Sequence, residues 1–178
     1  MKFISTGFEG LILIKHNIFR DKRGFFKEKF RSNDLENLFG EKINFCQENS
    51  VKSKINVLRG LHFQEPPFAQ AKLISISYGK ILDVAVDIRE GYKTYGTYFS
   101  YILDANKNES IFIPKGFAHG YLTLSDSALI NYHVDNYYNP DKECGIPYDD
   151  NFLKINWGIQ KNKIIISKKD NSYKSFQW

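Results

Sequence analysis

Short runs of apolar and β-branched residues, separated by turn residues, recur along most of the chain. Runs of this length and composition predict β-strands rather than helices. We expect strands at residues 11–15, 25–30, 45–51, 56–64, 70–78, 81–89, 98–103, 110–113, 120–124 and 128–138. About ten short strands with one helix predict a mostly β protein, an antiparallel β-sandwich or barrel of jelly-roll type. Residues 164–167 are either one more strand or a docking tail.

One segment, residues 32–39 (SNDLENLF), has the pattern of a short helix. Asn33 can cap its start, with Glu36 three residues further on, and Gly40 can end it. This is the only good helix signal in the chain.

Two connections between strands are also predicted. Residues 52–54 are expected to turn the chain into the strand that follows. Gly79 and Lys80 separate two apolar runs by two residues, a spacing that predicts a β-hairpin.

The least ordinary strand pattern is that of residues 56–64, NVLRGLHFQ, in which Arg59, Gly60 and His62 interrupt apolar residues. Polar groups in an apolar strand are costly if they are buried without partners, so this cluster indicates a site. Side chains alternate faces along a strand. Arg59 and His62 therefore point to opposite faces unless Gly60 bends or bulges the strand.

Length and composition narrow the class of protein. The 178 residues predict one domain, residues 1–178, with a C-terminal tail docked on it. The net charge of +5 arises from 25 bases mixed among 20 acids, which is compatible with a phosphorylated ligand but is no nucleic-acid-binding tail. Cys46 and Cys144 read as reduced thiols, and neither a signal peptide nor a membrane-spanning run is present. We expect a soluble cytoplasmic protein without a nucleic-acid or membrane partner.

The chain has four histidines, and a lone histidine is usually a packed structural residue. A jelly roll of cupin type can hold a metal with a close histidine pair, a glutamate and a distant histidine. Here His62 is followed by Phe63 and Gln64, so only His62 and His119 remain as candidates. Two imidazoles without a third ligand make a poor metal site, and we expect none.

The remaining inventory suits proton transfer at a carbon next to a carbonyl group. It comprises a base near neutrality in His62, cations in Arg59 and Lys72, and several tyrosines that can pass a proton. Each has a structural alternative, since Lys72 can extend from a strand edge and most tyrosines pack in a core.

A set of motifs spread over nearly the whole chain carries a resemblance to a known family. The motifs are DKRGFFKEKF (21–30), QENS (47–50), VLRGLHFQ (57–64), QAKL (70–73), GKILDVAVDIR (79–89), IPKGFAHG (113–120), YHVDNYYNP (132–140) and SKKD (167–170). In this order they resemble the dTDP-4-dehydrorhamnose 3,5-epimerases, sugar-nucleotide epimerases of cupin fold. The resemblance implies a cupin fold, a homodimer, and no cofactor or metal.

The resemblance also implies catalytic roles. His62 matches the general base, and Asp170 matches the carboxylate that orients and charges it. Lys72 matches the cation facing the C4 carbonyl oxygen, where enolate charge develops. Tyr132 matches the phenol that returns a proton from the opposite face and thereby inverts the centre.

Ligand contacts are implied in the same way. Arg59 and His119 match residues at the sugar and diphosphate, and Tyr138 and Phe26 match positions beside the base. Further ligand contacts are implied for Arg23, Glu28, Gln47, Asn49, Glu143 and Lys169. In the family the residues matched by Arg23, Phe26 and Glu28 come from the partner subunit.

The implied reaction is inversion of C3 and C5 in a nucleotide-linked 4-keto-6-deoxyhexose, from dTDP-4-dehydro-6-deoxy-D-glucose to dTDP-4-dehydro-L-rhamnose. Two alternatives remain open at this point. One is an epimerase that inverts C3 only or acts on another dTDP- or GDP-linked 4-keto sugar. The other is a nucleotide-sugar-binding cupin that has lost its chemistry, because a fold alone does not establish activity.

Overall fold

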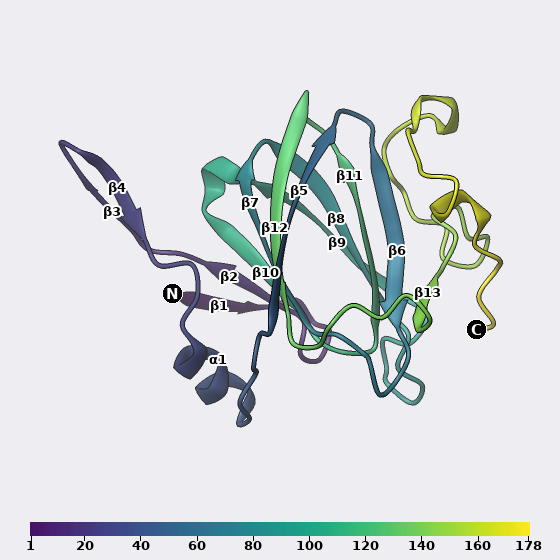
Figure 1. Ribbon diagram of the computed structural model, residues 1–178, viewed down its shortest axis with the longest axis horizontal. Coiled ribbons are helices and arrows are strands. Elements are labelled where there is room, and N and C mark those ends of the chain that lie inside the picture. The colour runs from purple at the N-terminus through teal and green to yellow at the C-terminus, as the bar shows by residue number, and fades with distance from the viewer.

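The computed structural model describes residues 1–178 and is built from two facing antiparallel sheets (Figure 1). The six-stranded sheet has the order β1 (Lys2–Ser5), β2 (Ile12–Lys15), β10 (Glu109–Ile113), β7 (Lys72–Tyr78), β12 (Ser127–Val134), β5 (Gln47–Lys54). The five-stranded sheet has the order β13 (Glu143–Gly145), β6 (Leu58–Gln64), β11 (Phe117–Thr123), β8 (Lys80–Asp87), β9 (Tyr98–Asp104). Most strands that are adjacent in the sheets are distant in sequence, as in a jelly roll, and the predicted fold class is confirmed.

Apolar side chains, which alternate with outward-facing ones along each strand, fill part of the space between the sheets. Leu13, Ile74, Ile111 and Ile130 contribute from the six-stranded sheet, and Ala85 is among those from the five-stranded sheet. Because this core occupies only part of the space between the sheets, polar side chains of the same inner faces can line a cavity elsewhere.

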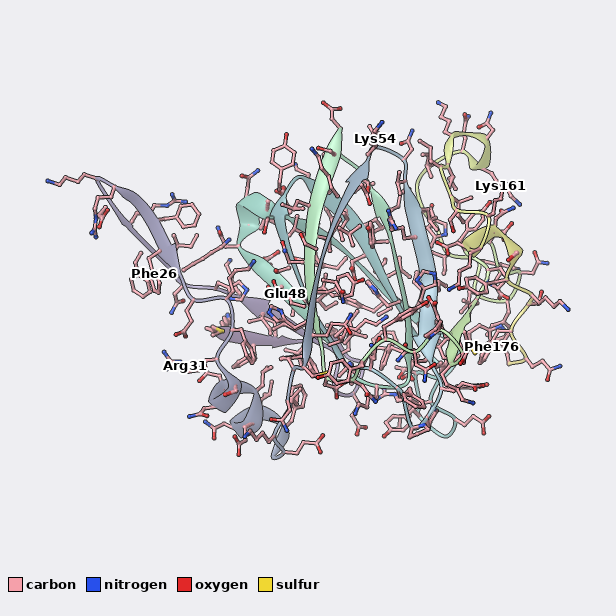
Figure 2. All side chains as sticks on the ribbon, viewed as in Figure 1. Phe26, Arg31, Glu48, Lys54, Lys161 and Phe176 are labelled. Carbon is pink, nitrogen blue, oxygen red and sulfur yellow. The ribbon has the colours of Figure 1, made fainter.

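Each sheet also buries its outer face. The helix α1 (Ser32–Phe39) places Leu35 against the outer side of the six-stranded sheet. The long C-terminal segment covers the outer side of the five-stranded sheet, where Trp157 and Phe176 pack against strand residues (Figures 1 and 2). Three short 3-10 turns lie outside the sheets, η1 (Ala105–Lys107), η2 (Lys161–Lys163) and η3 (Asp170–Ser172). No helix of the chain has the length and apolarity needed to cross a membrane.

The predicted hairpin at Gly79 and Lys80 is wrong. Strands β7 and β8 are consecutive, but they belong to different sheets, so the connection is a corner between the sheets. Gly79 has φ = 78°, and a Cβ there would lie 2.1 Å from the Ser127 carbonyl oxygen. Only glycine meets both demands. A short glycine-containing connection looks the same in sequence whether the next strand pairs with the last one or crosses to the facing sheet.

Two other local predictions need correction. The helix has the predicted bounds and ends at Gly40, which has φ = 72° and donates its N–H to the Glu36 carbonyl. Its N-cap, however, is Arg31, and no side chain caps the helix. Residues 52–54 form no turn, because they continue strand β5 and pair with β12 up to the partners Lys54 and Ser127.

The strands β3 (Ile18–Asp21) and β4 (Gly24–Lys27) form a hairpin arm that extends away from the two sheets (Figure 1). Its phenylalanines are exposed, with 62% for Phe19, 57% for Phe25 and 66% for Phe26. Figure 2 shows Phe26 on this arm, far from the C-terminal segment. Apolar side chains on a projecting hairpin have nothing in their own chain to pack against, which is typical of an interaction element.

The packing of the C-terminal segment predicts that Trp157 contributes strongly to the stability of the fold. Its ring is 6% exposed and its indole N–H donates to the Tyr148 carbonyl at 2.8 Å. Trp157→Ala should lower the free energy of unfolding in denaturant by about 3–5 kcal/mol, because it leaves a cavity beneath the segment. Tyr78→Ala, at a 60% exposed position, is the control and should change it by about 0.5 kcal/mol or less. Equal effects of the two substitutions would contradict this role.

Candidate active site

A bulge in β6 places Arg59 and His62 on one side of the sheet. Across the β6–β11 pair, His62 faces His119 and Arg59 faces Tyr121, so β6 has one residue more than β11 between these partners. The irregular step contains Gly60, which has φ = 106° and whose Cβ would lie 2.5 Å from the His119 carbonyl oxygen. The glycine thus bulges the strand, the condition under which Arg59 and His62 can point to the same face. Both polar side chains line the same cavity.

The carboxylate of Asp170 holds this arrangement from the C-terminal segment. One oxygen lies 2.9 Å from His62 Nε2, and the other accepts the Gly60 N–H at 3.2 Å. Burial raises the pKa of Asp170, but these hydrogen bonds outweigh burial and leave the pKa below its usual value. Because a carboxylate only accepts, the proton of a neutral His62 belongs on Nε2, and Nδ1 is left free to take up a proton.

A second histidine–carboxylate pair lies beside the first. His119 Nε2 is 2.8 Å from Asp83 Oδ2, and burial lowers the pKa of His119 although the Asp83 charge opposes the shift. The other Asp83 oxygen is buried without a hydrogen-bond partner. Sequence reasoning missed Asp83; the available signal was an acid within the apolar run of residues 81–86.

Lys72 begins strand β7 and lines the cavity from the six-stranded sheet. Burial lowers the pKa of its ammonium to about 8, while the charges of Asp83 and Glu143 act in the opposite direction. Its Nζ lies 3.4 Å from the His62 carbonyl oxygen. A cation at this position is available to a negative charge that develops inside the cavity.

Tyr132 reaches the cavity from β12, on the wall opposite to His62. Burial raises the pKa of its phenol, so the group remains protonated at neutral pH and can act as an acid. The base and the phenol therefore come from facing sheets. This separation follows directly from the jelly-roll topology.

Arg59 is held by two groups that sequence reasoning did not single out. Its Nε donates to Ser53 Oγ at 3.2 Å, and the same hydroxyl lies 3.0 Å from the phenol oxygen of Tyr121. Ser53 and Tyr121 are both buried. They restrict the guanidinium on its inner side and leave the rest of its fork of donors for a ligand.

Glu143 connects the cavity with its rim. Its carboxylate accepts the Tyr138 hydroxyl at 2.6 Å, forms an ion pair with Lys169, and lies 3.9 Å from His62 Nδ1. Burial raises the pKa of Glu143, but the bonds from Lys169 and Tyr138 outweigh it and lower the pKa. Gln47 is tied to the same rim by accepting the Tyr138 N–H at 3.3 Å.

The cavity has a volume of about 730 Å³, within the range for small-molecule sites. It brings together most of the residues that the resemblance assigns, namely Gln47, Asn49, Arg59, His62, Lys72, His119, Tyr132, Tyr138, Glu143, Lys169 and Asp170. Arg23, Phe26 and Glu28 do not line it. Arg23 and Phe26 lie on the arm and Glu28 directly follows it, and the two charged residues pair with Asp21 and Arg31.

The arrangement can transfer protons at a polarised carbon. It combines an oriented imidazole, a phenol on the facing wall, an ammonium between charged neighbours and cations at the rim. The chain has no group of three or more His, Cys, Asp or Glu side chains placed to hold a metal ion.

Comparison with known proteins places the chain among its relatives. The family model described as dTDP-4-dehydrorhamnose 3,5-epimerase matches residues 5–177. The dTDP-4-dehydrorhamnose 3,5-epimerase of Escherichia coli strain K12 is 42% identical over 170 residues, which cover 96% of this chain and 91% of that protein.

Solved structures agree. The crystal structure of dTDP-4-dehydrorhamnose 3,5-epimerase from Elizabethkingia anophelis NUHP1 has a TM-score of 0.95 at 39% identity, covering 99% of this chain and 96% of that one. The dTDP-6-deoxy-D-glucose-3,5-epimerase of Legionella pneumophila Philadelphia 1, in complex with dTDP-4-keto-L-rhamnose, has a TM-score of 0.92 at 40% identity, covering 98% and 92%. The chain belongs to the dTDP-4-dehydrorhamnose 3,5-epimerase family, as its motifs predict.

Proposed function

We propose that this protein inverts C3 and C5 of dTDP-4-dehydro-6-deoxy-D-glucose to form dTDP-4-dehydro-L-rhamnose. The observation that carries the proposal is the pairing of the His62–Asp170 dyad with Tyr132 across one cavity. The C4 ketone of such a sugar acidifies the hydrogens on both of its neighbours, so one base and one acid can serve both carbons. We infer that the reaction takes place in the cytoplasm, where the unpaired thiols Cys46 and Cys144 would persist.

Proton abstraction is assigned to His62. Asp170 keeps the proton on Nε2, so Nδ1 takes the hydrogen from C3 or C5, and the imidazolium that results is stabilised by the carboxylate. The electron pair of the broken C–H bond moves into an enolate whose negative charge lies on O4. Lys72 is the cation proposed to face this oxygen, and its burial strengthens the interaction.

Inversion requires that the new proton arrive from the other face of the ring. Tyr132, on the facing sheet, is proposed to donate it; solvent then returns a proton to the phenolate and takes the abstracted proton from His62. If His62 both removed and returned the proton, the configuration would not change. The two-sheet architecture thus supports epimerisation rather than simple exchange.

Binding is proposed to involve the rim and a second subunit. Arg59 and His119 would contact the sugar and diphosphate, while Gln47, Asn49, Tyr138, Glu143 and Lys169 would contact the rest of the ligand. The exposed arm is the element that a homodimer would use, with Arg23, Phe26 and Glu28 completing the site of the other copy. This assignment gives the exposed phenylalanines a place to be buried.

The proposal predicts isotope incorporation at two carbons. With dTDP-4-keto-6-deoxyglucose in deuterated water, proton NMR should show deuterium entering both C3 and C5 as the product forms. His62→Ala should abolish both signals of exchange while dTDP still binds, because the base is lost and the rim is intact. Tyr132→Phe should slow epimerisation more than it slows exchange.

Other outcomes would change the assignment. Deuterium at C3 alone would indicate a 3-epimerase. Binding of dTDP without exchange on this sugar or on GDP-linked 4-keto sugars would indicate a binding protein. Unchanged epimerisation by Tyr132→Phe would remove the two-face mechanism.

The pKa of Lys72 predicts a falling limb in the pH profile. The group must be protonated to stabilise the enolate, so kcat/KM should decline as the pH rises through about 8. The raised pKa of Tyr132 keeps that group from contributing near this pH. Lys72→Arg, which stays charged, should lose this limb even if its rate is lower. A flat wild-type profile above pH 8 would contradict the role of Lys72.

Subunit complementation tests the shared site. His62→Ala lacks the base, and the double variant Arg23→Ala/Phe26→Ala lacks the arm contacts. Refolded together in equal amounts, they should recover about one quarter of the wild-type rate, because half of the dimers are mixed and each has one intact site. An activity equal to the mean of the separate variants would place the arm outside the partner's site.

A further inference from the structure

The turn that carries Asp170 also carries an aromatic residue for which no role has been assigned. The 3-10 turn η3 (Asp170–Ser172) is followed at once by Tyr173. Residues three apart on a 3-10 turn lie on the same side, so Asp170 and Tyr173 both face strand β6. The turn is stabilised locally, since Ser172 Oγ donates to the Lys169 carbonyl at 2.7 Å and Asp170 N–H donates to Ser167 Oγ at 3.0 Å.

The ring of Tyr173 sits directly on Gly145. A Cβ added to Gly145 would lie 2.3 Å from Tyr173 Cε2 and within 2.5 Å of two further ring atoms. Gly145 is the residue of β13 that pairs with His62 of β6. The missing side chain of Gly145 therefore forms a socket, immediately beside the proposed base, that the tyrosine ring fills.

Within this socket the tyrosine contacts the base. The rings of Tyr173 and His62 lie 5.8 Å apart at an interplanar angle of 73°, an edge-to-face arrangement. The His62 side chain lines the cavity and is 29% exposed, so protein covers most of its surface. Asp170 restrains the ring at Nε2, and Tyr173 restrains it from the side.

The hydroxyl of Tyr173 does not open into the cavity. Its oxygen is buried without a hydrogen-bond partner, and Tyr173 is not among the residues that line the cavity. Burial, with the charge of Glu143, raises the pKa of this phenol to about 12, so it stays neutral. A neutral phenol that does not touch the cavity can affect the reaction only through its neighbours.

We propose that Tyr173 is a positioning residue for His62, and that Gly145 is the socket which allows its ring to reach the imidazole. The ring blocks rotation of the imidazole away from Asp170 and so keeps Nδ1 aimed at the substrate carbon. This inference rests on the proposed function of His62 as the base. It also makes residues 145 and 173 a matched pair, since any side chain at 145 displaces the ring.

Four variants separate ring, hydroxyl and socket. Tyr173→Phe keeps the ring and removes only the unpartnered hydroxyl, so it is the matched control. Tyr173→Leu keeps apolar volume so that the segment still docks, but removes the edge-to-face contact. Gly145→Ala keeps tyrosine at position 173 but forces its ring out of the socket. The double variant Gly145→Ala/Tyr173→Leu completes the cycle.

Two readouts are measured on each variant. The first is kcat and KM for epimerisation, and the second is the ¹⁵N NMR signals of the His62 ring nitrogens without substrate. With four histidines in the chain, these signals can be assigned by comparison with His62→Ala. The NMR readout requires no turnover, so failure of the proposed reaction would not be mistaken for failure of the positioning role.

We expect Tyr173→Phe to retain kcat within about twofold and to keep the wild-type His62 signals. Tyr173→Leu and Gly145→Ala should each lower kcat about tenfold with little change in KM and should shift the His62 signals, because a misplaced base costs rate rather than binding. The double variant should be no slower than the slower single variant, since both changes act on one contact. Wild-type His62 signals in Tyr173→Leu and Gly145→Ala, or additive losses in the double variant, would overturn the proposal.

Discussion

The site depends on the two hydrogen bonds that the Asp170 carboxylate accepts. The bulge at Gly60 points the side chains of Arg59 and His62 toward the same cavity. It also removes the Gly60 N–H from the regular hydrogen-bond ladder between β6 and β11. Asp170 accepts hydrogen bonds from that N–H and from Nε2 of the His62 imidazole. An unpaired buried carboxylate would cost several kcal/mol, so the bulge, the base and the C-terminal segment stabilise one another or fail together.

The C-terminal segment consequently has two roles that cannot be separated. Its apolar residues, Trp157 and Phe176 among them, cover the outer face of the five-stranded sheet. The same segment delivers Lys169, Asp170 and Tyr173 to the edge of the cavity on one short turn. Burial of the apolar part provides the free energy that holds the polar part in register.

Charge in the cavity is balanced rather than of one sign. Lys72 lies near Asp83 and Glu143, and Lys169 is paired with Glu143. The ammonium of Lys72 is therefore kept near a pKa of about 8 instead of losing its proton to burial altogether. Such balance allows a charged electrophile and a base to share one cavity, which proton transfer next to a carbonyl requires.

Much of this protein was determined by local sequence alone. Strand-length apolar runs predict a jelly roll, residues 32–39 predict the helix with its true bounds, and the motifs around Arg59, His62 and Lys72 predict the family. The prediction of a hairpin at Gly79 was wrong because strand pairing depends on the whole sheet. A two-residue connection does not show which strand the next one pairs with. Asp83 and Tyr173 escaped notice for a related reason, since the role of each depends on a neighbour distant in sequence.

Residue types and periodicity are local properties, and they determined the secondary-structure elements and the chemical groups available. Which side chains meet across 108 residues, as His62 and Asp170 do, was decided only by tertiary packing, because burial of the apolar faces sets where each strand lies.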